Sequence, residues 1–202
     1  ATGARLIRFK PSATNKEPSL LEGSVTRSYS LFALAAPPPC RHDRTMSAHL
    51  ISTRFSSPDA TTESAVRLGA LLVPGDVVLM TGDVGAGKTH FARALSLSLL
   101  TEPEDVPSPT FTLVQTFDSA ETQIWHADLY RLTSTTEVEE LGLMEAFETA
   151  ICLVEWPDRL GNLRPRTALD LTFAHGAGEN ERQLTCTWSA ATWDKRVQQW
   201  LS

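Results

Sequence analysis

A glycine-rich segment that ends in Lys-Thr is the part of the chain whose residue types most directly imply chemistry. Gly82, Gly87, Lys88 and Thr89 occupy the fixed positions of the pattern G-x-x-x-x-G-K-[ST], which binds the phosphates of nucleotides. In such a loop the backbone N–H groups surround phosphate oxygens, the lysine reaches the β- and γ-phosphates, and the hydroxyl ligates Mg²⁺. The residues that we predict to bind the nucleotide here are Gly82, Asp83, Val84, Gly85, Ala86, Gly87, Lys88 and Thr89.

The residues on either side of this loop have the patterns of a buried strand and of an amphipathic helix. Residues 77–80 are apolar and include two β-branched valines, as in a parallel strand that is covered on both faces. After the loop, Phe91, Leu95 and Leu99 recur every four residues, which predicts a helix. A strand, a loop and a helix in this order favour nucleotide binding over a glycine turn that carries an incidental lysine.

Two carboxylates, Asp128 and Glu155, each end a predicted strand downstream of the loop; these strands are expected over residues 123–129 and 151–154. Open α/β sheets bind ligands at the carboxyl ends of their strands, so both acids are placed to hold Mg²⁺ or to orient an attacking water. Their spacing does not decide which acid contacts the metal, and a turn-capping role is the structural alternative for each. Trp156, beside Glu155, either stacks on an aromatic ring or fills the core.

The elements that must position these residues follow from periodicity and turn residues. Ser108 and Pro109 are expected to form a stiff turn that leads into a strand ending at Val114. The residues from 169 to 188 predict two antiparallel strands around a turn. Other predicted elements are an edge strand at 50–55, a helix that starts at 56–59 and continues to 72, helices at 134–141 and 144–149, and a C-terminal helix at 193–201.

The charge of the 202-residue chain is unevenly distributed. Residues 1–45 are rich in Ser, Arg and Pro and carry seven Lys/Arg against three Asp/Glu, whereas the whole chain has a net charge of −6. We therefore predict a disordered leader over 1–45, either a targeting segment or translated sequence upstream of Met46, and a separate P-loop domain over 46–202. An acidic domain is a poor lone partner for a phosphate backbone, so any nucleic acid is expected to be held by another protein.

Cysteine spacing and hydropathy limit the classes of protein to which the chain can belong. Cys40, Cys152 and Cys186 form no C-x-x-C pair, which argues against a zinc site and against a disulfide framework. No apolar run approaches the ~20 residues that span a membrane. We expect a cytoplasmic protein, or an organellar one if residues 1–45 are a transit segment.

Four segments in order resemble the TsaE family, the small bacterial ATPases needed to make threonylcarbamoyladenosine in tRNA. The segments are GDVGAGKT followed by F-x-R, SPTFTLV, HADLYRL and LVEWP, and the resemblance covers Met46 to about Trp200. It implies an α/β fold, a P-loop NTPase-like three-layer sandwich with a mostly parallel central sheet, to which the strand pair at 169–188 adds an antiparallel C-terminal hairpin. It also implies slow hydrolysis of ATP with Mg²⁺, with TsaD and TsaB proteins as partners, so that tRNA is met only through the complex.

The resemblance also implies roles for the site residues, motif by motif. Lys88 and the loop amides would hold the phosphates, Thr89 and Glu155 would bind Mg²⁺, and Asp128 would assist at the metal or the water. Lys88, Asp128 and Glu155 are thus the predicted catalytic residues. The predicted metal ligands are Thr89, Glu155 and Asp128, and each of them would bind through a side-chain oxygen.

The resemblance also has implications outside the phosphate-binding loop. Pro58 and Thr61 belong to a stretch that would lie beside the adenine. His90 departs from the family, which often has a second hydroxyl residue at this position. The switch-like loop of the family would comprise Ser108, Pro109, Thr110 and Thr112.

A small-molecule or nucleotide kinase that uses the same loop is the main alternative, and a nucleotide-dependent switch with negligible turnover is a third. A kinase needs an acceptor site and usually an arginine-rich lid. The chain shows neither plainly, although Arg159, Arg164 and Arg166 follow the strand that ends at Glu155.

Overall fold

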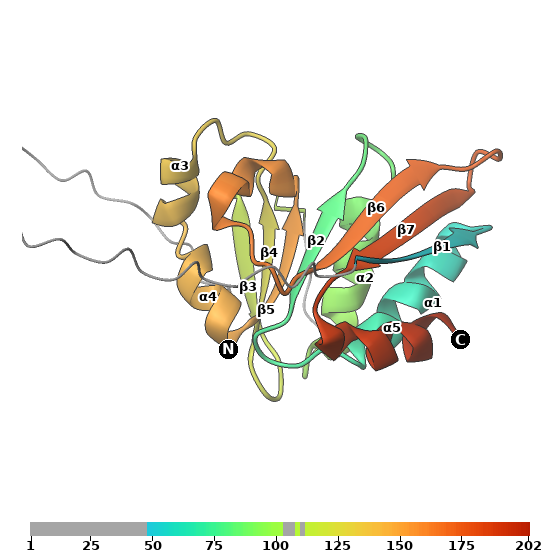
Figure 1. Ribbon diagram of the computed structural model, residues 1–202, viewed down its shortest axis with the longest axis horizontal. Coiled ribbons are helices and arrows are strands. Elements are labelled where there is room, and N and C mark those ends of the chain that lie inside the picture. The colour runs from blue at the N-terminus through green and yellow to red at the C-terminus, as the bar shows by residue number, and fades with distance from the viewer. Residues whose placement is uncertain (1–47, 103–107, 110–111) are drawn as a thin grey trace, which may run out of the picture. The chain divides into compact units, whose positions relative to one another are not determined.

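Seven strands form a single sheet in the computed structural model, which describes residues 48–102, 108–109 and 112–202. The predicted leader over 1–45 lies outside the described residues. The strands are β1 (His49–Phe55), β2 (Val77–Thr81), β3 (Val114–Asp118), β4 (Gln123–Asp128), β5 (Ile151–Glu155), β6 (Leu169–His175) and β7 (Arg182–Trp188). Their spatial order is β1-β7-β6-β2-β5-β4-β3 (Figure 1).

Parallel pairing forms the centre of this sheet and antiparallel pairing forms both of its sides. Strand β2 pairs in parallel with β5 and with β6, and β5 pairs in parallel with β4. Strand β3 returns antiparallel to β4, β7 returns antiparallel to β6, and β1 adds antiparallel to β7. The predicted α/β class, with central parallel strands and an antiparallel C-terminal hairpin, is confirmed.

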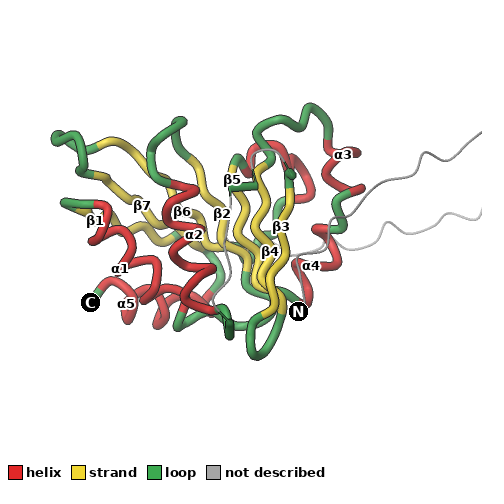
Figure 2. Tube along the Cα trace, turned by 180° about the vertical axis from the view of Figure 1, so that it is seen from behind, coloured by secondary structure: helices red, strands yellow, loops and turns green. Residues whose placement is uncertain are grey.

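Helices cover both faces of the sheet and make three layers (Figure 2). One layer contains α1 (Pro58–Gly69), α2 (Lys88–Leu99) and α5 (Asp194–Leu201), the last preceded by the 3₁₀ turn η2 (Ala191–Trp193). The opposite layer contains α3 (Thr135–Glu140), α4 (Leu143–Thr149) and the 3₁₀ segment η1 (Pro157–Leu163). Within the described ranges, none of these helices combines the length and the apolar character that crossing a membrane requires.

The central strands are apolar throughout because each of their faces is covered by helices. In β2, Val78 and Met80 join the core beneath α1, α2 and α5, whereas Val77 and Leu79 join the core beneath α3 and α4. All four side chains are at most 2% exposed. Alternation along the strand thus distributes a continuous apolar run between two cores.

The prediction of a strand that ends at Val114 is wrong, because the strand begins at that residue. The backbone N–H groups of Thr112 and Leu113 both donate to the carbonyl oxygen of Pro109, at 3.1 and 2.8 Å, which makes this stretch a turn. Leu113 has a φ of +65°, a left-handed conformation that a strand does not contain. Strand β3 therefore starts only at Val114 and forms a hairpin with β4.

The turn that leads into β2 is attached to the C-terminal helix by an ion pair. Asp76 is buried, and its two carboxylate oxygens accept from the two terminal nitrogens of Arg196, with Nη2 3.1 Å from Oδ1. The backbone N–H of Val73 also donates to Asp76 Oδ2 at 2.8 Å. The guanidinium of Arg196 stacks on the ring of Trp193 at 3.9 Å. These contacts position the start of β2, and hence the loop at its far end.

Replacement of Asp76 by alanine should lower the free energy of unfolding by about 2–4 kcal/mol, because it leaves the partly buried Arg196 without its carboxylate. Equilibrium unfolding in urea measures this loss. Asp118→Ala is the matched control, since the exposed Asp118 carboxylate contacts only the Gln123 amide in the described structure, and it should change stability by less than about 0.5 kcal/mol. Equal effects of the two substitutions would contradict this role of the ion pair.

Candidate functional site

The glycine-rich loop joins β2 to α2, as predicted, and its conformation requires glycine. At Gly82 a β-carbon would lie 2.4 Å from the carbonyl oxygen of Phe173 on β6, so no side chain fits there. Gly87 is the N-cap residue of α2, with a φ of +110° and without a side-chain capping bond. The N–H groups of the first turn of α2 are therefore left for an anion, at the positive end of the helix dipole.

Lys88 is held inside this loop. The residue is only 4% exposed, and its Nζ donates to the carbonyl oxygens of Gly82 and Asp83 at 2.7 and 2.9 Å. Burial lowers the pKa of Lys88 from its ordinary value, and nearby carboxylates oppose this effect. The carboxylates that oppose it, in decreasing order, are Glu155, Asp128 and Asp83.

Glu155 meets the loop because β2 and β5 pair in parallel with Met80 opposite Glu155. The hydroxyl of Thr89 donates to Glu155 Oε2 at 2.9 Å. The other carboxylate oxygen, Oε1, lies 2.9 Å from Nε2 of His126, a fully buried side chain on β4. Glu155 is 2% exposed, so both of its oxygens are bonded within the protein interior. The structure thus brings together the predicted Thr89 and Glu155.

His126 is a site residue that we did not include among the candidates from the sequence: it could ligate or donate a hydrogen bond, but a lone histidine is more often structural. A carboxylate only accepts hydrogen bonds, so Nε2 of His126 carries the proton and donates to Glu155. The available signal was its position two residues before Asp128, which places both side chains on the same face of one strand.

Asp128 lies beside Glu155 at the same end of the sheet. The two residues are register partners in the β4–β5 pair, and Asp128 is 5% exposed. Its Oδ1 accepts from the backbone N–H of Tyr130 at 3.0 Å, which is the turn-capping bond that the sequence left as an alternative. Asp128 therefore shapes the turn after β4 while keeping a second carboxylate at the site.

Trp156 directs its ring to the loop. It follows Glu155 with a φ of +59°, which turns the chain sharply at the end of β5. Nζ of Lys88 lies 4.3 Å from the centre of the Trp156 ring, and the ring of Tyr130 packs against the same indole at 4.9 Å. The indole thus packs both on an aromatic ring and on the loop lysine.

The start of α1 lies against the first turn of α2. Nε2 of His90 is 2.9 Å from the hydroxyl of Thr62 and 3.2 Å from the carbonyl oxygen of Pro58. The structure thus places Pro58 near the loop helix, through the residue that departs from the family pattern. Thr61 is 2% exposed and donates its hydroxyl to the Ser57 carbonyl, so its side chain belongs to the first turn of α1.

The predicted switch-like loop reaches the site through its C-terminal part. Leu113 accepts a backbone hydrogen bond from the N–H of Asp128 at 2.8 Å, which places the turn formed by Pro109 and Thr112 beside the end of β4. Ser108 is half-buried and Thr112 is exposed, whereas Thr110 lies outside the described residues.

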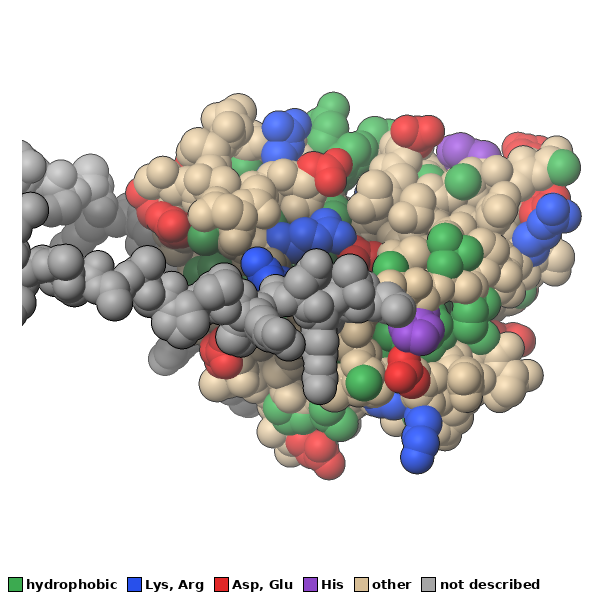
Figure 3. Space-filling model, in the orientation of Figure 1, with side chains coloured by type: hydrophobic (Ala, Val, Ile, Leu, Met, Phe, Trp, Pro, Cys, Tyr) green, Lys and Arg blue, Asp and Glu red, His purple; other side chains and the backbone are tan. Residues whose placement is uncertain are grey.

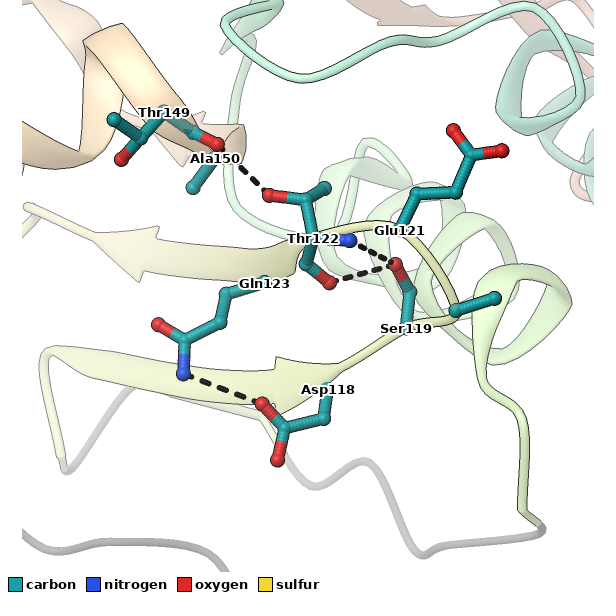
Figure 4. A pocket seen from close by; sticks show the side chains of 8 residues that line it. Asp118, Ser119, Glu121, Thr122, Gln123, Thr149 and Ala150 are labelled. Carbon is teal, nitrogen blue, oxygen red and sulfur yellow. Dashed lines mark hydrogen bonds between the residues drawn. The ribbon is translucent and has the colours of Figure 1, made fainter.

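A cavity of about 470 Å³ lies elsewhere, at the β3–β4 turn (Figure 4). The hydroxyl of Ser119 donates to the carbonyl oxygen of Thr122 at 2.6 Å, and the hydroxyl of Thr122 donates to the carbonyl oxygen of Thr149. The turn precedes β4, whereas Asp128 ends β4, so the cavity is at the opposite edge of the sheet from the loop. It takes no part in the site described above.

Comparison with known proteins points to one family. The family model described as threonylcarbamoyl adenosine biosynthesis protein TsaE matches residues 55–184. A protein of Rickettsia bellii named "tRNA threonylcarbamoyladenosine biosynthesis protein TsaE" is 38% identical over 121 residues, which cover 60% of this chain and 84% of that protein. The protein of the same name from Bacillus subtilis is 36% identical over 136 residues, 66% of this chain and 83% of its own.

A solved structure agrees with these sequences. The crystal structure of Bacillus subtilis YdiB superposes with a TM-score of 0.64 at 27% identity, and covers 77% of this chain and 96% of its own. The likeness therefore extends over nearly the whole of that structure.

Replacement of His126 by leucine should lower the free energy of unfolding by about 1–3 kcal/mol, because Glu155 Oε1 would stay buried without a donor. His126→Gln keeps an N–H donor and should lose less. Urea unfolding of both variants measures the difference, with the exposed His175→Gln as a control. A His126→Leu protein as stable as the wild type would show that the His126–Glu155 bond contributes nothing.

Proposed function

This chain belongs to the TsaE family, and we propose that it is the ATP-binding and ATP-hydrolysing component of tRNA threonylcarbamoyladenosine biosynthesis. The role in that pathway follows from family membership, whereas the ATPase activity is inferred from the site. The observation that carries the inference is the 2.9 Å bond between Thr89, the last residue of the phosphate-binding pattern, and the buried Glu155. This bond joins the loop to the carboxylate that its chemistry needs.

The loop supplies the groups that bind the phosphates of ATP. The N–H groups of the first turn of α2 donate to no side-chain cap at Gly87, and they lie beside Lys88. Lys88 Nζ now rests on two carbonyl oxygens, and a phosphate oxygen is a stronger partner for an ammonium group. We expect Lys88 to exchange at least one carbonyl for the β- or γ-phosphate when ATP binds.

The donor set beside the loop fits Mg²⁺. Thr89, Glu155 and Asp128 present a hydroxyl and two buried carboxylates at one end of the sheet, and Mg²⁺ is held by oxygen ligands that include one or two carboxylates together with substrate phosphates. Bound Mg²⁺ would supply positive charge to the phosphate oxygens.

The protein groups around these ligands hold the reacting atoms in place. His126 fixes the orientation of Glu155 through its bond to Oε1. We propose that Asp128, the register partner of Glu155, accepts a hydrogen bond from the water that attacks the γ-phosphate. The ring of Trp156 covers Lys88 from one side and so limits the access of bulk water to it, and the ring of Tyr130 packs against that indole.

We propose that the chain acts with TsaD and TsaB proteins in the cytoplasm and meets tRNA only through them. Two apolar side chains flank the nucleotide site and are exposed, Val84 in the loop at 76% and Tyr130 at 50%, which suits a protein partner that closes over the nucleotide. On the face drawn in Figure 3, basic side chains are interspersed with acidic ones instead of forming a stripe. That pattern, with a net charge of −6, supports an indirect contact with nucleic acid.

Removal of the Lys88 ammonium group should weaken ATP binding at least tenfold, because a charge-assisted hydrogen bond is lost, while the fold is retained. Isothermal titration of Lys88→Ala with ATP in Mg²⁺ measures this, and the exposed Lys195→Ala is the charge-matched control. Glu155→Gln should reduce the gain in affinity that Mg²⁺ gives over EDTA. Wild-type affinity in Lys88→Ala would refute the assignment of the loop, and a normal Mg²⁺ response in Glu155→Gln would transfer the metal role to Asp128.

A further inference from the structure

An arginine from the C-terminal hairpin lies against the phosphate-binding loop. Nη2 of Arg182, the first residue of β7, is 3.5 Å from the carbonyl oxygen of Gly85. A β-carbon on Gly87 would lie 3.9 Å from both Cγ and Nε of the same side chain. The guanidinium therefore borders the last two glycines of the loop, about a hundred residues earlier in the sequence.

The topology of the sheet explains this position. Strands β2 and β6 are parallel neighbours, so the loop after β2 and the turn after β6 lie at the same edge (Figure 1). Arg182 shares a face of β7 with Leu184 and Cys186, which pack in the core beneath α1 and α2. Its side chain thus points to the face of the sheet on which α2 and the loop lie.

The charge of Arg182 has no carboxylate partner within 4.0 Å among the described residues. The hydrogen bonds of its guanidinium in the described structure go to carbonyl oxygens: Nη1 donates to Glu179 and Glu181 at 2.8 and 2.9 Å, and Nη2 to Gly85. These bonds orient the side chain without neutralising it. A planar guanidinium fixed in this way is suited to a phosphate, which it binds more strongly than a neutral carbonyl.

Side chains of opposite charge lie on the two sides of β2 in the sheet. The carboxylates Glu155 and Asp128 come from β5 and β4 on one side of β2, whereas Arg182 comes from β6 and β7 on the other. A polyphosphate in the loop would have its metal-binding side toward the carboxylates and its opposite side toward the arginine. The loop amides next to Gly85 and Gly87 are those that cradle the α- and β-phosphates in this motif.

We propose that Arg182 is a nucleotide-binding residue that donates to an α- or β-phosphate oxygen of the bound nucleotide, as a second cation beside Lys88. This rests on the proposed ATP binding of the chain. Because the contact does not involve the γ-phosphate, Arg182 serves ADP and ATP alike, and it keeps the nucleotide attached through hydrolysis until ADP leaves.

Titration of Arg182→Gln with ATP and with ADP, in Mg²⁺, tests the proposal. Both affinities should fall about tenfold and by similar factors, Arg182→Lys should recover part of the loss, and the salt dependence of binding should decrease. Arg54→Gln is the matched control, since exposed Arg54 lies on the neighbouring strand, is opposite Gln183, and should bind both nucleotides as the wild type does. Thermal unfolding of each variant separates folding from binding.

Three results would overturn the proposal. Wild-type affinity of folded Arg182→Gln for both nucleotides, beside a Lys88→Ala protein that no longer binds, would remove the role of Arg182 and leave ATP binding intact. A loss confined to ATP would place the contact at the γ-phosphate instead. Failure of the wild-type chain to bind either nucleotide would refute the proposed function and the role of Arg182 together.

Discussion

The parallel pairing of β2 with β5, with Met80 opposite Glu155, is the constraint on which the site depends. Strand β2 delivers the glycine-rich loop at its carboxyl end, and β5 delivers a carboxylate at the same edge. A shift of one residue in β5 would turn Glu155 to the other face of the sheet. The bond from the Thr89 hydroxyl to Glu155 Oε2, at 2.9 Å, forms only in the observed register. The apolar residues of both strands hold that register through two cores.

Burial increases the effect that the hydrogen bonds of these few polar groups have on stability. Glu155 and His126 are withdrawn from water, and an unbonded polar group there would lower stability by more than its bond adds. Burial also lowers the pKa of Lys88, against the nearby carboxylates. Charges of both signs are thus held by the fold at the end of the sheet where the phosphates and a metal ion would bring further charge. Such preorganisation is the main means by which phosphoryl transfer is catalysed.

Local patterns were sufficient to predict the loop, its flanking strand and helix, and the strands that end in Asp128 and Glu155. They failed where distant contacts decide the outcome. The stretch expected to be a strand ending at Val114 forms a turn instead. Leu113 adopts a left-handed conformation there, which a leucine in the sequence does not predict. The partner of His126 comes from another strand, and Arg182 reaches the loop only because the hairpin folds beside β2. The spacing of these residues along the chain predicts neither contact.

The central chemical proposal is that this site transfers the terminal phosphate of ATP to water. Among the arginines that a kinase lid would use, Arg164 is paired with Asp170, so it is engaged in a contact within the domain. The direct measurement is the release of inorganic phosphate from ATP and Mg²⁺ by the wild-type chain, alone and with the TsaD–TsaB pair. We predict slow release that rises when the pair is added. No release in the presence of the pair, or consumption of ATP only when a small-molecule acceptor is supplied, would contradict it.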